Sequence, residues 1–325
     1  MPPPAPLILD TVVGAEDLLQ EELSPVGRVR ITEPGVIELD PAESMSAVLA
    51  DLAGRDFYSG VRVRLPDAEL DTSLPWLTFA LSAIGLDGPA GYRVDQRDAD
   101  QRRLLSTRIA ALTGWAEAPS NWVINCRPDG PDLVVDIGPL HWSRRHHRLE
   151  RLPWSTPVVV AEVLVRLAKV RPDDRLLDPC CGAGTNLVAA AQAGVRSLLG
   201  VDLDPTAVSA ARTNLDRAGV QGRIRRGSAT ELDLKPGSID RVVANLPFGK
   251  QVGSHGSNQA LYPALLAGLS RALTPGGRMV LLTEDKGLFA ETVQRTAGLK
   301  IIKQRLLRYS GASPTAYVIS RTRSR

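Results

Sequence analysis

The sequence predicts an α/β protein whose C-terminal half is a doubly wound sheet and whose N-terminal half is α+β. Three short apolar runs in the C-terminal half end in the polar residues Asp178, Asp202 and Asn245, and helical segments follow them. Strands that alternate with helices are typical of a parallel sheet. The N-terminal half instead places two strands in succession between its helices, which is typical of α+β folds.

Residues 1–66 contain six expected elements in the order strand, helix, strand, strand, helix, strand. This order is the split unit of ferredoxin-like folds, so we predict such a domain here. The expected elements are Leu7–Val13, Glu16–Leu23, Arg28–Thr32, Val36–Leu39, Ser44–Ala53 and Tyr58–Leu65.

Residues 67–148 form a second N-terminal region, which starts with a proline-containing stretch. The pattern beyond it predicts one helix and three strands, two of them joined by the turn at 128–131. The expected elements are the strand Tyr92–Asp95, the helix Gln101–Leu112, and the strands Trp122–Cys126 and Leu133–Ile137.

A glycine-containing loop at 178–185 connects the apolar run Arg175–Leu177 to a small-residue segment that reads as a helix. Glycines at 182 and 184 let the backbone approach a ligand closely, and the amides of the helix start can donate to a carboxylate or phosphate. Eighteen residues past Gly184, another apolar run ends in Asp202, the place of the acidic residue that binds ribose in doubly wound nucleotide sites. A lone acidic strand end is commonly only a turn or helix cap, but three polar strand ends in order favour a site.

The segment Asn245-Leu246-Pro247-Phe248 follows the third apolar run. The amide oxygen of Asn245 and the carbonyl of Leu246 can accept hydrogen bonds from the two N–H groups of a planar ring amine. Phe248 would stack on the ring, and Pro247 would fix the turn. The competing interpretation of the tetrapeptide alone is a strand that ends in an ordinary turn.

These three segments together resemble the class I S-adenosylmethionine-dependent methyltransferases that methylate amines. The loop at 178–185 matches the family's D-P-x-C-G-x-G-T, Gly200-Val201-Asp202 its ribose-binding strand end, and residues 245–248 its [D/N]-x-P-[Y/F] motif. Leu246, Gly249-Lys250 and Leu261-Tyr262 narrow the resemblance to the THUMP-domain guanine-N2 methyltransferases of tRNA. The resemblance covers about residues 151–320 and implies a class I methyltransferase domain over 149–325 with a terminal antiparallel strand pair. Its further elements are Pro157–Ala168, Thr206–Ala218, Asn258–Leu273, Arg278–Thr283, Gly287–Ala297, Lys300–Leu307 and Thr315–Ser320.

The resemblance also implies S-adenosylmethionine as cofactor, with its methionine part on Gly182, Gly184 and Thr185 and its ribose on Asp202. Two positions depart from the family pattern: Ser228 stands where an aspartate commonly holds the adenine amine, and Cys180 replaces an aromatic residue. A neutral hydroxyl predicts weaker adenine recognition. The expected cofactor residues are Asp178, Cys180, Gly182, Gly184, Thr185, Asp202, Ser228, Ala229 and Asn245, and the expected catalytic residues are Asn245, Leu246, Pro247 and Phe248.

The charge is divided unevenly along the chain. Residues 1–150 carry 14 arginines, no lysine and 23 acidic residues, a net of −9, whereas residues 151–325 carry 25 basic and 13 acidic residues, a net of +12. The element order of residues 67–148 resembles the RNA-binding THUMP module, although an unrelated α+β domain would have the same order. The expected RNA contacts are Arg144, Arg145, Arg148 and Lys250.

Composition is that of an intracellular globular enzyme: 43% of the 325 residues are hydrophobic and 23% charged. Three cysteines and four histidines show no disulfide framework or metal spacing, so we expect no metal. The apolar runs are too short to span a bilayer and the start lacks signal-peptide features, so we expect a cytoplasmic protein without membrane association, and a monomer.

The function implied by the resemblance is methylation of guanine N2 in the acceptor-stem region of tRNA. Alternatives are guanine-N2 methylation of ribosomal RNA, methylation of DNA adenine or protein glutamine through the same motif, and a noncatalytic RNA-binding scaffold. An N-terminal region without affinity for RNA would favour DNA or protein as substrate.

Overall fold

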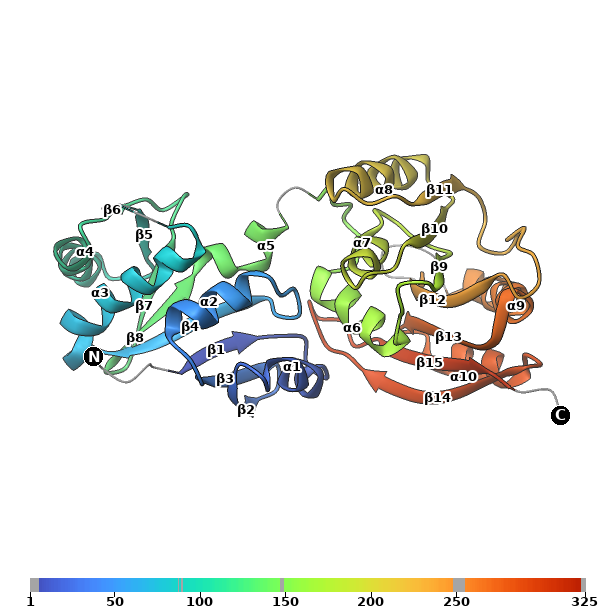
Figure 1. The fold of residues 1–325 in the computed structure, drawn as a ribbon, viewed down its shortest axis with the longest axis horizontal. Coiled ribbons are helices and arrows are strands. Elements are labelled where there is room, and N and C mark those ends of the chain that lie inside the picture. The colour runs from blue at the N-terminus through green and yellow to red at the C-terminus, as the bar shows by residue number, and fades with distance from the viewer. Residues whose placement is uncertain (1–5, 87, 89, 147–148, 248–254, 323–325) are drawn as a thin grey trace. The chain divides into compact units, whose positions relative to one another are not determined.

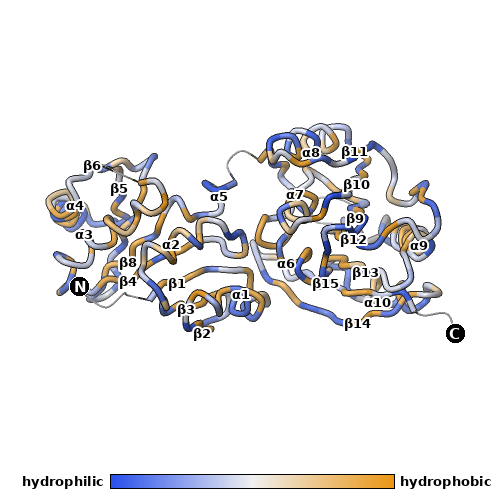
Figure 2. Tube along the Cα trace, in the orientation of Figure 1, coloured by the Kyte–Doolittle hydropathy of each residue, from blue (hydrophilic) through white to orange (hydrophobic). Residues whose placement is uncertain are grey.

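A computed structural model describes residues 6–86, 88, 90–146, 149–247 and 255–322 (Figure 1). The chain forms two compact units, Met1–His147 and Arg148–Arg325. Apolar segments recur in the strands and helices of both units (Figure 2), as expected for units with their own cores. No helix among the described residues combines the length and apolar character needed to cross a bilayer.

The first part of the N-terminal unit confirms the predicted order of six elements. Its strands are all antiparallel and lie in the order β2-β3-β1-β4, so that β3 pairs between β2 and β1. This is the arrangement of the split unit. The elements are β1 Leu7–Asp10, α1 Glu16–Leu23, β2 Gly27–Glu33, β3 Val36–Pro41, α2 Met45–Ala53 and β4 Gly60–Pro66.

The second part of this unit extends the same sheet, because β8 pairs with β4 and the strand order continues as β8-β7-β5-β6. The structure adds a helix, α3, within the proline-containing stretch that the sequence left unassigned. The identity of residues 67–148 as a THUMP-like module stays a prediction. The elements are η1 Asp67–Glu69, α3 Leu70–Ala80, η2 Leu81–Ile84, β5 Gly91–Val94, α4 Ala99–Thr113, β6 Ala116–Glu117, β7 Ile124–Asp129, β8 Asp132–Ile137, η3 Gly138–Leu140 and α5 Trp142–Arg145.

The C-terminal unit confirms the doubly wound sheet. Its strand order is β11-β10-β9-β12-β13-β15-β14, with the first five strands parallel and β15 antiparallel to both neighbours. The strands are β9 Arg175–Asp178, β10 Ser197–Asp202, β11 Arg223–Arg226, β12 Ile239–Asn245, β13 Leu273–Thr283, β14 Leu299–Leu306 and β15 Thr315–Arg321. The helices are α6 Val158–Ala168, α7 Thr185–Gln192, α8 Pro205–Arg217, α9 His255–Ala272 and α10 Lys286–Arg295.

Both faces of the sheet are buried at its centre. In β12 the consecutive residues Val242, Val243 and Ala244 are all fully buried, although successive side chains of a strand point to opposite faces. Val242 and Ala244 belong to a core with residues of α9 and α10, where the rings of Tyr262 and Phe289 meet edge to face at 5.3 Å. This burial on both sides explains why the strands read as continuous apolar runs.

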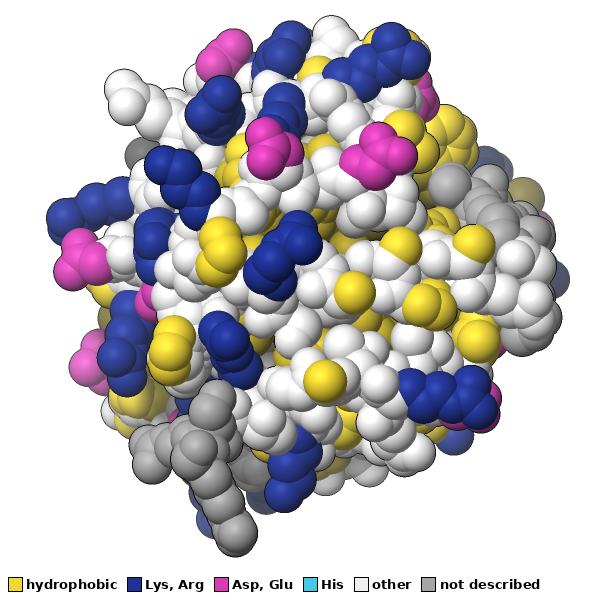
Figure 3. Space-filling model, turned by 90° about the vertical axis from the view of Figure 1, so that its right-hand side faces the viewer, with side chains coloured by type: hydrophobic (Ala, Val, Ile, Leu, Met, Phe, Trp, Pro, Cys, Tyr) yellow, Lys and Arg dark blue, Asp and Glu magenta, His cyan; other side chains and the backbone are white. Residues whose placement is uncertain are grey.

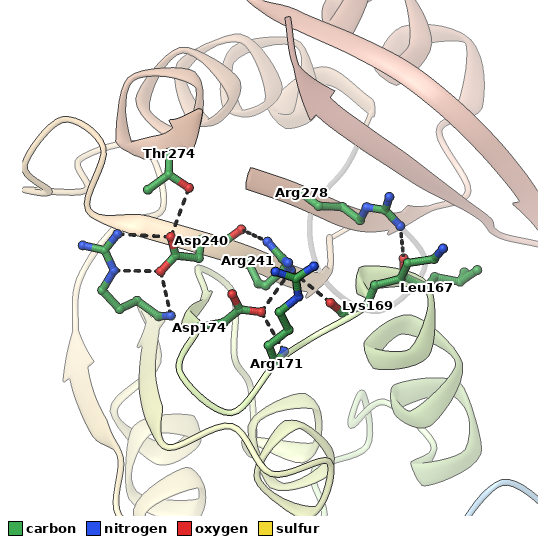
Figure 4. A network of polar contacts seen from close by, with 9 residues as sticks. Leu167, Lys169, Arg171, Asp174, Asp240, Arg241, Thr274 and Arg278 are labelled. Carbon is green, nitrogen blue, oxygen red and sulfur yellow. Dashed lines mark hydrogen bonds and ion pairs between the residues drawn. The ribbon is translucent and has the colours of Figure 1, made fainter. Parts of the chain in front are cut away.

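A polar network joins the strands at their amino ends (Figure 4). Asp240 accepts from the Arg175 side chain at 2.8 and 3.1 Å, from the Arg175 amide at 3.0 Å and from Thr274 Oγ1 at 3.1 Å. The hydrogen bonds from Arg175 lower the pKa of Asp240 to about 2. The neighbouring Arg241 pairs with Asp174 at 3.2 Å. The network therefore links β9, β12 and β13 at the edge where these strands begin.

We predict that Asp240→Asn lowers the free energy of unfolding by about 1 kcal/mol at neutral pH, because a paired carboxylate is lost at a partly exposed site. A carboxyl whose pKa is depressed stabilises the fold above its ordinary pKa, and this contribution disappears as the pH falls from 3.8 through about 2. Urea unfolding at several pH values measures the difference. Asp173→Asn is the control, since Asp173 is 94% exposed and 3.9 Å from its partner Arg196. An equal loss in both variants would contradict the prediction.

Candidate active site

The predicted site residues lie together at the carboxyl edge of the C-terminal sheet. Asp178, Asp202 and Asn245 are the last residues of β9, β10 and β12, which are consecutive in the sheet. From β9 the chain winds outward through β10 to β11 and then returns to β12 on the other side of β9. A crevice at such a reversal point is where open α/β sheets bind ligands.

The glycine loop is tied to the end of β10. The carboxylate of Asp202 accepts from the amide of Gly182 at 2.8 Å and from that of Asp204 at 3.0 Å, and Cys181 N–H donates to the Val201 carbonyl at 3.0 Å. Gly182 has φ +52, and a Cβ added to it would meet no atom within 4 Å. Open space therefore adjoins the loop at the point where the backbone of a non-glycine residue would be strained.

Gly184 serves a different purpose in the loop. It precedes α7 with φ +80, and a Cβ there would lie 3.2 Å from Ala211 Cβ and 3.3 Å from Ala211 Cα on α8. This glycine thus allows α8 to pack directly against the loop. Asn214 on the same helix donates to the Ala183 carbonyl at 2.8 Å, which fixes the contact.

Asp178 is fully buried beneath the loop. It accepts from Asn186 Nδ2 at 2.9 Å and from the Cys180 amide at 3.1 Å. Burial outweighs these hydrogen bonds and raises the pKa of Asp178 to about 7, with a smaller contribution from the charge of Asp202. The Asp178 carboxyl therefore supports the loop and is titratable near neutral pH.

Burial raises the pKa of both thiols of the loop, Cys180 and Cys181, and the nearby Asp178 and Asp202 add to the shift. Both cysteines consequently remain protonated at neutral pH. A thiolate is the nucleophilic form of cysteine, so these side chains act here by packing rather than by covalent chemistry.

The residues of this crevice fit S-adenosylmethionine. Each Asp202 oxygen accepts one backbone hydrogen bond and keeps a lone pair for a ribose hydroxyl. Leu203, the next residue, is 64% exposed and offers apolar surface to a purine, a feature that sequence reasoning missed. The hydroxyl of Ser228, two residues beyond β11, lies 2.7 Å from Thr230 Oγ1 and accepts from the Thr230 amide at 3.2 Å. Ser228 Oγ thus has a hydrogen-bond partner two residues away, and weaker adenine recognition stays a prediction.

The predicted catalytic motif begins at the end of β12. Asn245 Nδ2 donates to Thr156 Oγ1 at 3.2 Å, while Asn245 Oδ1 is buried without a hydrogen-bond partner among the described residues. Tyr262 donates to the Pro247 carbonyl at 3.0 Å, and the Leu246 amide donates to the Leu282 carbonyl at 2.9 Å. The backbone is therefore held on both sides of the Leu246 carbonyl. Phe248 and Lys250 lie outside the described residues.

The expected RNA contacts differ in their surroundings. Arg145 is 8% exposed, pairs with Asp56 at 2.8 Å, donates to the Tyr58 carbonyl and lies over the Tyr58 ring, so it is used inside the N-terminal unit. Arg144 lies over the Trp122 ring at 4.3 Å, and Arg93 lies over the same ring at 5.3 Å. Arg148 lies outside the described residues.

Comparisons with known proteins agree with a methyltransferase fold. Residues 157–313 match the model of the RMKL-like methyltransferase domain. A tRNA (guanine(6)-N2)-methyltransferase of Thermus thermophilus is 29% identical over 95% of this chain and 97% of its own length. The crystal structure of TrmN from Thermus thermophilus has a TM-score of 0.75 at 25% identity and covers 98% of this chain and all of that one. The bovine tRNA (guanine(6)-N(2))-methyltransferase THUMP3 is 30% identical over 59% of this chain, which spans only 41% of that protein.

The fold and the site define a methyltransferase of the class I type. The stretch that matches the RMKL-like methyltransferase domain, residues 157–313, makes up most of the C-terminal unit.

We predict that Gly184→Ala destabilises the protein more than Gly219→Ala, by about 1 kcal/mol, because both positions have positive φ but only Gly184 touches a neighbouring backbone. The same variant should bind S-adenosylmethionine more weakly, because the added methyl group would press against Ala211 of α8 and displace the glycine loop. Urea unfolding and calorimetric titration measure the two effects. Equal destabilisation of the two variants would show that close packing of α8 does not constrain the loop.

We predict that the free energy of unfolding falls with rising pH between 3.8 and about 7 because of Asp178, at up to about 1.4 kcal/mol per pH unit. Over this range the folded state holds the Asp178 proton more tightly than the unfolded state does, and above it the contribution is constant. Asp178→Asn should flatten the dependence, since Asn186 can rotate Oδ1, which has no partner among the described residues, toward the new amide. Chemical unfolding across this pH range measures the free energy of unfolding of both proteins. If it changes equally with pH in wild type and Asp178→Asn, Asp178 is excluded as the cause.

Proposed function

We propose that the protein transfers the methyl group of S-adenosylmethionine to the N2 amine of a guanosine in structured RNA, most specifically in the acceptor-stem region of tRNA. The observation that carries this proposal is Asn245 Oδ1, a buried acceptor without a partner among the described residues, at the end of the strand beside the one that leads into the glycine loop. A buried acceptor without a donor is costly, and an amine of the substrate would satisfy it.

The chain's residues act chiefly by positioning. S-adenosylmethionine supplies an electrophilic methyl group on a sulfonium. Asn245 Oδ1 and the Leu246 carbonyl accept from the two N–H groups and turn the nitrogen lone pair toward the methyl carbon. A new N–C bond forms as the S–C bond breaks, and the S–C electron pair stays on sulfur. The methylated amine then loses one proton to water, because its cationic form is strongly acidic.

RNA as the substrate class is supported by the charge and by the relatives. The C-terminal residues 151–325 carry a net charge of +12, and Lys and Arg side chains are spread widely over the face drawn in Figure 3. Positive surface binds the phosphate backbone without regard to sequence. The Thermus relative named as a tRNA (guanine(6)-N2)-methyltransferase matches nearly the whole length of both chains. A paired guanosine must leave its stack to reach the strand ends, so the base would be extruded from the helix.

The N-terminal residues 67–148 would hold the RNA by shape and phosphate contacts and thereby select the nucleotide. Arg144 remains the proposed contact in this region. Arg148 and Lys250 also remain proposed contacts. Arg145 instead holds α5 to the segment 55–58, so its loss would disturb the fold of the N-terminal unit.

We predict that Asn245→Ala lowers kcat by at least about a hundredfold while RNA affinity is unchanged, because one hydrogen bond to the reacting amine is lost. The measurement is mass analysis of nucleosides after incubation of the protein with S-adenosylmethionine and bulk tRNA. Ser24→Ala, a change of an exposed residue outside the proposed RNA-binding region, is the control.

Parallel transfer assays with ribosomal RNA, DNA and protein, together with calorimetric titration of S-adenosylmethionine, separate the alternatives. N2-methylguanosine in tRNA supports the proposal. If it appears only in ribosomal RNA, the substrate is ribosomal RNA and not tRNA. Transfer to DNA adenine or to protein glutamine but not to RNA would refute it. Failure to bind the cofactor in the micromolar range would favour a noncatalytic scaffold.

A further inference from the structure

We infer that Thr156 is a positioning residue, which anchors the amide of Asn245 so that its oxygen faces the reacting amine. The inference rests on the proposed function only for the role of Asn245. Thr156 and Asn245 are 89 residues apart, and the hydrogen bond from Nδ2 to Thr156 Oγ1 measures 3.2 Å. An amide plane held through its nitrogen directs its oxygen away from the anchor, and Asn245 Oδ1 has no hydrogen-bond partner in the described part of the chain.

Thr156 is itself fixed by the helix that follows. Pro157 precedes α6 with φ −59, the value that its ring imposes, and α6 has nine of its eleven residues buried. This helix packs against β12, the strand that ends in Asn245. The hydroxyl and the amide are thus carried by two elements of one core, so their separation is set by packing.

The chain before Thr156 is fixed as well. Glu150 N–H donates to Asn214 Oδ1 at 2.6 Å, and Asn214 Nδ2 donates to the carbonyls of Glu150 at 2.9 Å and Ala183 at 2.8 Å. Between these points, Leu152 and Ser155 close a turn with hydrogen bonds of 2.8 and 2.9 Å. The segment 150–156 therefore connects the glycine loop at one end to the catalytic amide at the other.

The role of the Thr156 hydroxyl can be tested by comparing Thr156→Val with Thr156→Ser. Valine keeps the shape and removes the acceptor, so kcat for guanosine methylation in tRNA should fall about tenfold with KM for tRNA unchanged. Serine keeps the acceptor and should restore kcat. Thr296→Val is the matched control, because the Thr296 hydroxyl, at the end of α10, donates to the Thr292 carbonyl of that helix at 2.8 Å, far along the chain from the predicted site residues. Equal kcat in Thr156→Val and wild type would overturn the inference.

A second measurement does not depend on activity. In ¹⁵N-labelled protein the side-chain amide signals of Asn245 are identified by their loss in Asn245→Asp. The proton that donates to Thr156 should shift in Thr156→Val and keep its wild-type position in Thr156→Ser. An unchanged signal in Thr156→Val would overturn the inference even if transfer to RNA is observed. A shifted signal in a protein that methylates no RNA would retain the anchor and refute the proposed function alone.

Discussion

Burial of both faces of the C-terminal sheet at its centre is the constraint on which the site depends. The middle of β12 is apolar on each side, so the polar side chains of this strand lie near its beginning and at its end. At the amino ends they form the ion pairs around Asp240 and Arg241. At the carboxyl ends Asp178 is buried beneath the glycine loop and Asp202 accepts from a loop amide, and Asn245 keeps one acceptor without a partner among the described residues. The polar side chains at the amino edge pair with one another, whereas the carboxyl edge keeps a hydrogen-bond acceptor for a ligand.

The carboxyl edge is held together by side chain contacts to backbone rather than by ion pairs. Asp202 binds the glycine-loop amide, Asn214 binds the loop carbonyl at Ala183, and Tyr262 binds the Pro247 carbonyl. Each contact joins a loop to a buried strand or helix, so the core holds the loops in place. Transfer between two bound groups requires such positioning more than it requires a strong acid or base. The raised pKa values of Cys180 and Cys181 agree with this, because neither thiol is ionised at neutral pH.

The sequence alone predicted the strand ends that build the site, because apolar runs of a doubly buried sheet and glycines at positive φ leave direct signals. It did not predict α3, where Pro75 stands inside a helix whose buried residues Leu70, Leu74 and Leu77 follow a helical period. Thr156 also escaped prediction, since a hydroxyl followed by proline has no distinctive pattern and its partner lies 89 residues away. Arg145 was predicted as an RNA contact from local charge, but its burial depends on Asp56 and Tyr58, distant in sequence.

A neutral amide suits the end of β12 better than a carboxylate would, given its neighbours. Asp178 and Asp202 already place two carboxyl groups on the adjacent strand ends, and their mutual repulsion contributes to the raised pKa of Asp178. A third charge beside them would add to that cost in a buried place. Asn245 provides the same acceptor oxygen without the charge, and its nitrogen provides the donor by which Thr156 can anchor it. The oxygen of the amide is thus the acceptor and its nitrogen the anchored donor. A carboxylate has no donor, so Thr156 could anchor it only by donating a hydrogen bond from its hydroxyl.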